Sequence, residues 1–275
     1  MTAFATAVEE GLVGGRLWLY SNYNCNLACT YCLTESAPDA ARRTLDRNLI
    51  SKIAAGAVAE GFTSFGVTGG EPFMRPDIVE ILLELESYLP VLVLSNATLF
   101  SGRVLEDVRR LAGKRIALQI SLDSASPEEN DEMRAQDNFE KVVTAIPKLV
   151  EMGIHVRIAT TGGDRTAEED AALCALHRSF GITDDDHVVR PIVHRGRAAT
   201  NEMGVVATAH DLPAELTVTA DGAFWTPFGP TVRNGRLDTD MLLARTTFPL
   251  EVSIAAMLEI AGAKPAGGDS LLNIR

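Results

Sequence analysis

Apolar residues recur along the first two thirds of the chain with two alternating periods, one typical of buried strands and the other of amphipathic helices. Short aliphatic runs predict six strands, at residues 16–20, 64–68, 91–95, 115–122, 154–160 and 187–193. Between them, helical spacing predicts helices at residues 45–60, 76–89, 104–111, 138–152 and 167–180. This alternation indicates an α/β fold whose parallel strands are joined by right-handed crossovers, either an open doubly wound sheet or a full or partial barrel.

The pattern changes after Gly196, where long helices no longer separate the apolar runs. Residues 216–219 and 224–225 flank the dipeptide Asp221-Gly222, which favours a tight hairpin turn. Only one further helix is predicted, at residues 250–260. We therefore expect a core that comprises residues 1–197 and a small C-terminal extension, or cap, that comprises residues 198–275.

Composition and charge narrow the class of protein further. Of the 275 residues, 46% are hydrophobic, which is enough to bury a large core and argues against global disorder. The formal net charge of −12 disfavours nucleic acid or an anionic membrane as a partner, since phosphate groups require clustered Lys and Arg. No uncharged apolar stretch reaches membrane-spanning length, and the N-terminal segment lacks the positive charge of a signal peptide. We expect a cytoplasmic protein.

Three of the four cysteines, Cys25, Cys29 and Cys32, follow the spacing CxxxCxxC. Thiolates are soft ligands that suit an iron–sulfur cluster or zinc. A structural zinc site needs four protein ligands, and no fourth Cys or His stands nearby, which makes zinc the weaker interpretation. Three thiolates can instead bind three irons of a four-iron cluster, so that the fourth iron keeps an open position. The remaining cysteine, Cys174, lies in an apolar helical segment and is expected to pack as a small core residue.

Glycine-rich and polar segments stand at the same end of several predicted strands. The cysteine segment follows the first strand, and Gly-Gly-Glu-Pro at residues 69–72 follows the second. Ser-Asn-Ala at residues 95–97 and Ser-Leu-Asp at residues 121–123 stand at the ends of the third and fourth. In parallel α/β folds, ligands bind at the carboxyl ends of the strands. The four segments are therefore predicted to meet at one rim of the sheet.

On these motifs the sequence resembles the radical S-adenosylmethionine (radical SAM) enzymes. Their CxxxCxΦC motif has an aromatic residue at Φ, where Tyr31 stands, and their Gly-Gly-Glu-Pro motif is present letter for letter. The resemblance covers about residues 16–197 and departs at Ala97, where glycine is usual. It implies a partial (βα)6 parallel TIM-like barrel with a small C-terminal extension, related to the SPASM/twitch and MoaA-like branch. Because no cysteine follows Cys174, the auxiliary-cluster cysteines of that branch are missing and a single 4Fe–4S cluster is expected.

The resemblance also implies roles for particular residues. The three cysteines would bind the cluster, and its open iron would chelate the amino and carboxylate groups of S-adenosylmethionine (SAM). Glu71 would accept hydrogen bonds from the ammonium group, and Tyr31 would lie near the adenine through its backbone. Ser121 and Arg134 would hold the ribose and the carboxylate, because a guanidinium is a planar and always-charged donor. The residues implied in SAM binding are Tyr31, Gly69, Gly70, Glu71, Asn96, Ser121 and Arg134.

The implied reaction begins with reductive cleavage of SAM to a 5′-deoxyadenosyl radical, which abstracts hydrogen from a substrate. The resemblance favours a peptide or a small natural-product or cofactor precursor as the substrate, and an electron donor such as flavodoxin or ferredoxin. It assigns no catalytic residue beyond the cofactor ligands. A non-catalytic iron–sulfur sensor or assembly protein built on the same barrel stays the alternative.

One basic segment, residues 190–197, stands out in an otherwise acidic chain. It contains Arg190, His194, Arg195 and Arg197. Arginine clusters bind carboxylate or phosphate groups in some proteins and form surface ion pairs in others. Two interpretations therefore stay open. The segment either holds an anionic group of a substrate, such as a nucleotide, or of the cofactor, or it forms a surface turn with paired charges.

Overall fold

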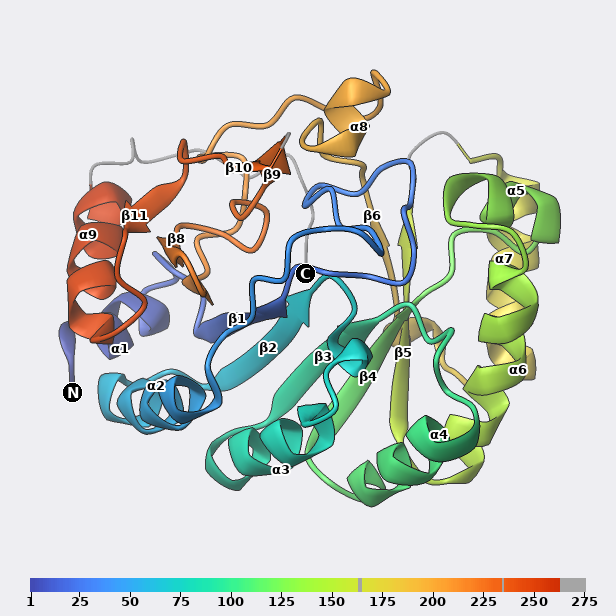
Figure 1. Cartoon of the computed structure of the whole chain (residues 1–275), viewed down its shortest axis with the longest axis horizontal. Helices are drawn as coiled ribbons and strands as arrows, with labels where there is room; N and C mark the ends of the chain where they lie inside the picture. The colour runs from blue at the N-terminus through green and yellow to red at the C-terminus, as the bar shows by residue number, and fades with distance from the viewer. Residues whose placement is uncertain (163–164, 234, 263–275) are drawn as a thin grey trace.

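A sheet of nine strands forms the centre of the computed structural model, which describes residues 1–162, 165–233 and 235–262 (Figure 1). The strand order is β11-β8-β7-β1-β2-β3-β4-β5-β6. Six successive strands are parallel, namely β1 (Arg16–Asn22), β2 (Ser64–Gly69), β3 (Val91–Ser95), β4 (Ile116–Ser121), β5 (His155–Thr161) and β6 (His187–Arg190). All six coincide with predicted strands. The α/β class and the partial TIM-like barrel are thereby confirmed.

The sixth strand is the one whose predicted length differs most from the structure. It ends at Arg190 instead of continuing to Val193. The next residue is Pro191, which has no N–H group and cannot donate to a neighbouring strand. The chain therefore leaves the sheet at this point and turns toward the rim.

Helices cover the outer face of the parallel strands (Figure 1). The predicted crossover helices all form, as α2 (Arg47–Glu60), α3 (Ile78–Tyr88), α4 (Gly102–Val108), α6 (Asn138–Glu151) and α7 (Ala167–Ser179). Three short helices were not predicted, namely α1 (Ala3–Glu9), α5 (Pro127–Met133) and α8 (Arg197–Thr200). They span too few turns for apolar periodicity to identify them. No described helix is long and apolar enough to cross a membrane.

Local hydrogen bonds explain where the crossover helices begin and end. The side chain of Asp46 accepts from the backbone N–H of Leu49 at 3.0 Å and caps the start of α2. Gly61, with a φ of 97°, ends the same helix in the left-handed conformation that glycine adopts freely. At the start of α7, Thr166 and Glu169 form a reciprocal capping box. These caps fix the helix ends and therefore the loops that reach the rim.

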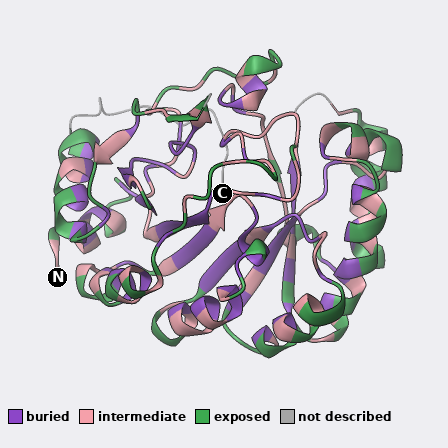
Figure 2. Ribbon diagram, in the orientation of Figure 1, coloured by how far each residue is buried: buried purple, intermediate pink, exposed green. Residues whose placement is uncertain are grey.

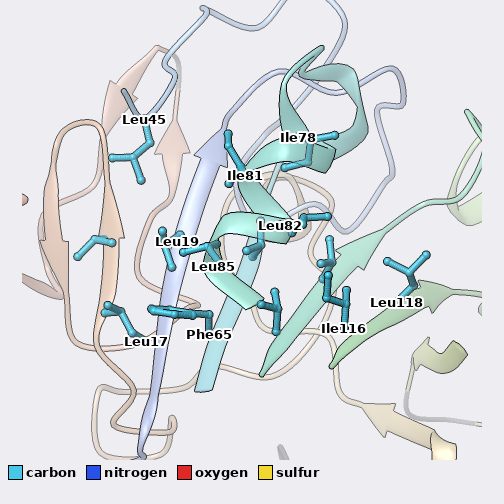
Figure 3. Close-up of a cluster of buried hydrophobic side chains, with 14 of the residues drawn as sticks. Leu17, Leu19, Leu45, Phe65, Ile78, Ile81, Leu82, Leu85, Ile116 and Leu118 are labelled. Atoms are coloured by element: carbon cyan, nitrogen blue, oxygen red, sulfur yellow. The ribbon is translucent and has the colours of Figure 1, made fainter. Parts of the chain in front are cut away.

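The two-residue period of the strands separates the hydrophobic core from the interior of the barrel. Leu17 and Leu19 of β1 belong to the same core as Leu82 of α3 (Figure 3). Trp18 and Tyr20, on the opposite face of β1, line a cavity in the barrel interior. Figure 2 shows the strands buried and the outward faces of the helices exposed. Burial of one leucine side chain contributes roughly 2 kcal/mol. The leucines of β1 therefore face the core, and the alternate positions of the strand face the barrel interior.

Part of the C-terminal segment extends the same sheet, and another part forms a separate sheet of two strands. Its elements are β7 (Thr217–Thr219), β8 (Gly222–Phe224), β9 (Val232–Arg233), β10 (Arg236–Leu237), β11 (Leu242–Ala244) and α9 (Leu250–Gly262). β7 runs parallel to β1 with Trp18 opposite Thr217, and β8 pairs antiparallel with β7. The hairpin predicted around Asp221 and Gly222 is therefore confirmed. The division at residue 197 stays a prediction, but backbone pairing joins the two parts into one sheet.

Candidate active site

The carboxyl ends of the parallel strands surround a cavity of about 220 Å³. Its wall contains every residue predicted to bind metal or SAM except Glu71, namely Cys25, Cys29, Cys32, Tyr31, Gly69, Gly70, Asn96, Ser121 and Arg134. These residues come from segments that lie far apart in the chain. The fold therefore brings the predicted motifs to one rim, as expected for parallel strands.

The cysteine side chains lie in the segment between β1 and α2. Burial raises the pKa of Cys25 to about 12, although the backbone N–H of Leu27 donates to its sulfur at 3.4 Å. Burial also raises the pKa of Cys29 above its usual value. Metals bind the thiolate form of cysteine. Metal binding at this segment must therefore displace protons from the thiols.

Arg197 fixes the path of the cysteine segment. Its guanidinium donates to the carbonyl oxygens of Cys29 at 2.7 Å and Ser36 at 3.0 Å. Its backbone N–H donates to the carbonyl oxygen of Cys32 at 2.9 Å. The preceding Gly196 has a φ of +54°, and a Cβ there would lie 2.2 Å from a backbone oxygen of the cysteine segment. The start of α8 thus packs directly on the backbone that carries the thiols.

Gly69 and Gly70 allow two loops to approach each other closely. A Cβ at Gly69 would lie 2.0 Å from the carbonyl oxygen of Asn22, and one at Gly70 would lie 2.1 Å from that of Asn24. The side-chain amide of Asn22 also donates to the carbonyl oxygen of Glu71 at 3.0 Å. The ends of β1 and β2 therefore form one unit. Since both glycines also line the cavity, peptide groups of this unit can face a ligand.

The carboxylate of Glu71 holds the end of β3. One oxygen accepts from the backbone N–H of Phe73 at 3.0 Å and the hydroxyl of Ser95 at 2.9 Å. The other oxygen accepts from the backbone N–H of Asn96 at 2.8 Å. Burial raises the pKa of Glu71 to about 6, against the opposing effect of these hydrogen bonds. The contact of Glu71 with the ammonium group of SAM stays a prediction, and without SAM its carboxylate binds these three donors.

Tyr31, Asp123 and Arg134 form a buried hydrogen-bonded group at the rim. The Tyr31 hydroxyl donates to Oδ2 of Asp123 at 2.6 Å. Arg134 donates to the same oxygen at 2.9 Å and also to the Tyr31 hydroxyl. Nε of Arg134 is buried without a partner among the described residues. Because an unpaired buried N–H is unfavourable, this nitrogen suits an acceptor from a ligand in the cavity.

Further polar side chains in the wall come from β3 and β4. Ser121 ends β4, and Asn96 follows β3, where its side-chain amide donates to Asn26 at 3.0 Å. Gln119 lies two positions before Ser121, and both atoms of its buried amide group lack a partner among the described residues. Gln119 was not among the predicted site residues. A single polar side chain between apolar neighbours, on the inward face of β4, is the signal that identifies it.

The basic segment at residues 190–197 serves more than one purpose. Arg190 lines the cavity at the end of β6. Arg195 is buried and forms ion pairs with Asp240 at 2.6 Å and Asp238 at 3.7 Å, which tie the C-terminal segment to the rim. Arg197 binds the cysteine segment, as described above. Arg195 therefore forms the expected ion pairs, although it is buried and not on the surface, and the role of Arg190 stays a prediction.

The residues of the cavity wall fit a 4Fe–4S cluster together with SAM. Three soft thiol donors line the cavity, and the unpartnered polar atoms of Gln119 and Arg134 belong to residues of the same wall. Within the described ranges, no three Cys, His, Asp or Glu side chains are gathered closely enough to hold a single metal ion. A four-iron cluster spreads its ligands over several metal atoms and does not require such a group.

Fold and site together define a class of protein, a partial parallel α/β barrel with three thiols at its rim. The family model described as the radical SAM superfamily matches residues 19–175. The chain therefore belongs to the radical SAM superfamily of enzymes. Membership implies a 4Fe–4S cluster and SAM as cofactors.

Similar proteins support the predicted branch of this superfamily. AlbA of Bacillus subtilis, an antilisterial bacteriocin subtilosin biosynthesis protein, is 32% identical over 62% of this chain and 40% of its own length. The probable GTP 3′,8-cyclase of Archaeoglobus fulgidus is 27% identical over 60% of this chain and 55% of its own length. This chain therefore matches only about half the length of these relatives, or less. The structure of native anSMEcpe with bound AdoMet and Cp18Cys peptide matches with a TM-score of 0.62 and 13% identity, over 91% of this chain and 84% of that one, which shows the fold alone.

Proposed function

We propose that this radical SAM enzyme cleaves SAM reductively and begins its reaction by abstracting hydrogen from a peptide or a small natural-product or cofactor precursor. One observation carries the proposal. A single cavity wall combines the three cysteine thiols with Gly69, Gly70, Ser121 and Arg134. Three thiolates leave one iron of a four-iron cluster without a protein ligand. The peptide, hydroxyl and guanidinium groups around it suit the amino-acid and ribose parts of SAM.

When bound, the reduced cluster and SAM supply a 5′-deoxyadenosyl radical. The residues of this chain bind and orient SAM. Arg134, held in place by Asp123, would bind the carboxylate through its unpaired Nε. Ser121 would bind the ribose, and the peptide groups of the Gly-Gly turn would accept from the ammonium group. The hydroxyl of Tyr31 is engaged with Asp123, so its backbone is the part available to adenine, and Asn96 is proposed as a further polar contact.

The proposed substrate class rests on the similar proteins. AlbA is named for the biosynthesis of a bacteriocin, and the anSMEcpe structure contains a bound peptide. We propose a peptide as the first choice and a small precursor as the second, with reduction by flavodoxin or ferredoxin. The net charge of −12 disfavours nucleic acid and an anionic membrane as partners. We further propose a cytoplasmic location, and a role for residues 198–275 as a twitch-like or SPASM-like extension that lacks a cluster.

Anaerobic reconstitution tests this function directly. The full chain is loaded with iron and sulfide, supplied with dithionite and SAM, and assayed for 5′-deoxyadenosine. We expect formation of 5′-deoxyadenosine by the native chain and by the control Cys174→Ala. The variants Cys25→Ala, Cys29→Ala and Cys32→Ala should lose both iron and activity.

Two outcomes would contradict the proposal. Fully iron-loaded protein that forms no 5′-deoxyadenosine would favour the non-catalytic sensor or assembly protein. If anaerobically purified protein contains zinc instead of iron, the chain does not bind an iron–sulfur cluster and the proposal fails.

A further inference from the structure

A second cavity, of about 420 Å³, lies inside the barrel next to the first. The two cavities share wall residues that include Tyr20, Leu94 and Arg190. A ligand bound in the second cavity would therefore contact residues that also line the cavity with the cysteines. The volume of the second cavity is within the range of small-ligand sites. None of the residues that the resemblance implies in cluster or SAM binding lies in the wall of this second cavity.

Two arginine side chains line the second cavity without a salt bridge, although the carboxylate of Glu215 is near enough to act on Arg190. Arg16, at the start of β1, and Arg190, at the end of β6, form no ion pair with any described carboxylate. Nε of each is buried and has no hydrogen-bond partner among the described residues. Burial and the nearby charge of Arg16 lower the pKa of Arg190 to about 10, against the opposing effect of Glu215. Two cations held close together and partly dehydrated favour the binding of an anion.

The charges of the wall indicate how many negative charges the ligand carries. Glu215 is the acidic residue of this wall, and its carboxylate accepts a hydrogen bond from the indole of Trp18. The guanidinium of Arg16 lies 5.4 Å from the centre of the Trp18 ring, which holds it by a cation–π interaction. Arg157, which lies near Arg190, is already paired with an aspartate at 3.5 Å. Two arginines and one glutamate leave a single positive charge in excess.

We propose that the second cavity is a substrate subsite in which Arg16 and Arg190 bind one carboxylate group of the substrate. A guanidinium binds a carboxylate through two parallel hydrogen bonds, and the unpaired nitrogens of both arginines supply donors. The aromatic and aliphatic side chains of Trp18, Leu94 and Phe228 form the rest of the wall and suit an apolar body attached to the carboxylate. A phosphate chain with several charges would exceed the single positive charge and meet Glu215. The assignment as a substrate subsite rests on the function proposed above.

A pair of small probes tests the subsite without the true substrate. N-acetyl-L-leucine and its neutral amide, N-acetyl-L-leucinamide, are titrated into the reconstituted full chain and followed by ligand-observed NMR. The acid should bind and the amide should bind far more weakly. Arg190→Gln and Arg16→Gln should each weaken binding of the acid by roughly tenfold or more, because each removes hydrogen bonds to a charged group. Glu215→Gln should strengthen binding of the acid, because it removes the negative charge of the wall.

Arg103→Gln is the matched control, because it removes the same charge from a side chain that is 92% exposed on α4. Circular dichroism and iron content verify that each variant is folded and loaded. Equal binding of acid and amide would overturn the proposal, as would acid binding that both arginine variants leave unchanged. Inorganic phosphate that binds more tightly than the acid through the same arginines would overturn the carboxylate assignment.

Formation of 5′-deoxyadenosine in the same samples separates this proposal from the proposed function. If the acid binds through the arginines but SAM is never cleaved, the enzymatic function fails while the carboxylate site stands. If SAM is cleaved but binding of the acid does not depend on the arginines, the subsite alone is wrong.

Discussion

Arg197 donates a hydrogen bond of 2.7 Å to the carbonyl oxygen of Cys29, although 168 residues separate the two in the chain. The same side chain donates to Ser36 at 3.0 Å, so one guanidinium spans the cysteine segment. A planar group with several donors holds two carbonyl oxygens at a fixed separation. The segment that carries the thiols is therefore positioned by a residue from beyond the sixth strand.

Replacement of Arg197 is expected to impair cluster binding without touching a thiol. Arg197→Met should lower the iron content and slow formation of 5′-deoxyadenosine by roughly tenfold or more, because two charge-assisted hydrogen bonds are lost. Arg197→Lys should restore part of the iron content, since an ammonium group can reach one carbonyl but cannot span both. The electron paramagnetic resonance spectrum of the reduced cluster should also change. Normal iron content and an unchanged spectrum in Arg197→Met would contradict the positioning role.

A methyl group at Gly70 is expected to separate the loops that follow β1 and β2. Gly70→Ala would place a Cβ 2.1 Å from the carbonyl oxygen of Asn24, which the backbone must move to relieve. We expect loss of SAM binding and destabilisation of roughly 2 kcal/mol or more, as for other forced overlaps in packed regions. The matched control is Gly262→Ala at the end of α9, where a Cβ meets nothing within 4 Å. Thermal unfolding and SAM affinity measure the effect, and equal behaviour of the two variants would refute it.

The group formed by Tyr31, Asp123 and Arg134 predicts unequal effects of two mild substitutions. Asp123→Asn leaves the buried guanidinium of Arg134 without its anion, which costs about 3–5 kcal/mol in comparable buried pairs. Tyr31→Phe removes one hydroxyl group and should cost only about 1 kcal/mol. Urea unfolding measures which of the two variants loses more stability. SAM affinity should fall strongly in Asp123→Asn and little in Tyr31→Phe. A larger loss of affinity in Tyr31→Phe would show that the ion pair with Asp123 does not hold Arg134 in place.

A buried histidine on α7 predicts a loss of stability in mild acid. Burial and the adjacent His187 lower the pKa of His177 from 6.5 to about 4, and neither ring nitrogen of His177 has a partner among the described residues. Between these two pH values the unfolded chain binds more protons than the folded chain, so stability falls as the pH decreases from 6.5 toward 4. His177→Leu should remove roughly 1–2 kcal/mol of this decrease, with allowance for solvent screening. His210→Gln, at an exposed position, serves as the control, and unfolding curves at pH 5 and 7.5 in which His177→Leu matches the native chain would contradict the prediction.

The parts of the site that could be predicted are those formed by residues next to one another in the sequence. The cysteine spacing and Gly-Gly-Glu-Pro are local patterns, and parallel strands bring their carboxyl ends together whatever the details of packing. The side-chain direction of Glu71 was not predictable, because its three donors come from two segments that only the folded chain brings together. Arg197 was recognised as part of a basic segment, but its partners lie too far away in the chain for spacing to reveal them.

The strands of the extension illustrate the same limit. The hairpin of β7 and β8 was predicted from its turn residues, yet nothing local indicated that β7 would pair with β1. Strand partners are set by the hydrophobic faces and the hydrogen bonds available at a sheet edge. Gln119 is the opposite case, since its inward position on β4 follows from strand alternation and could have been read from the sequence.

The pairing of β1 with β7 also affects the order in which the protein can be completed during its synthesis. Trp18 lies in β1, and its partner Thr217 in β7 is made much later in synthesis. Until then, one side of β1 has no neighbouring strand, and its backbone N–H and C=O groups stay available to other chains. We therefore expect a ribosome-bound chain that has not yet reached Thr217 to be more prone to aggregation than one in which β7 already covers this edge of β1.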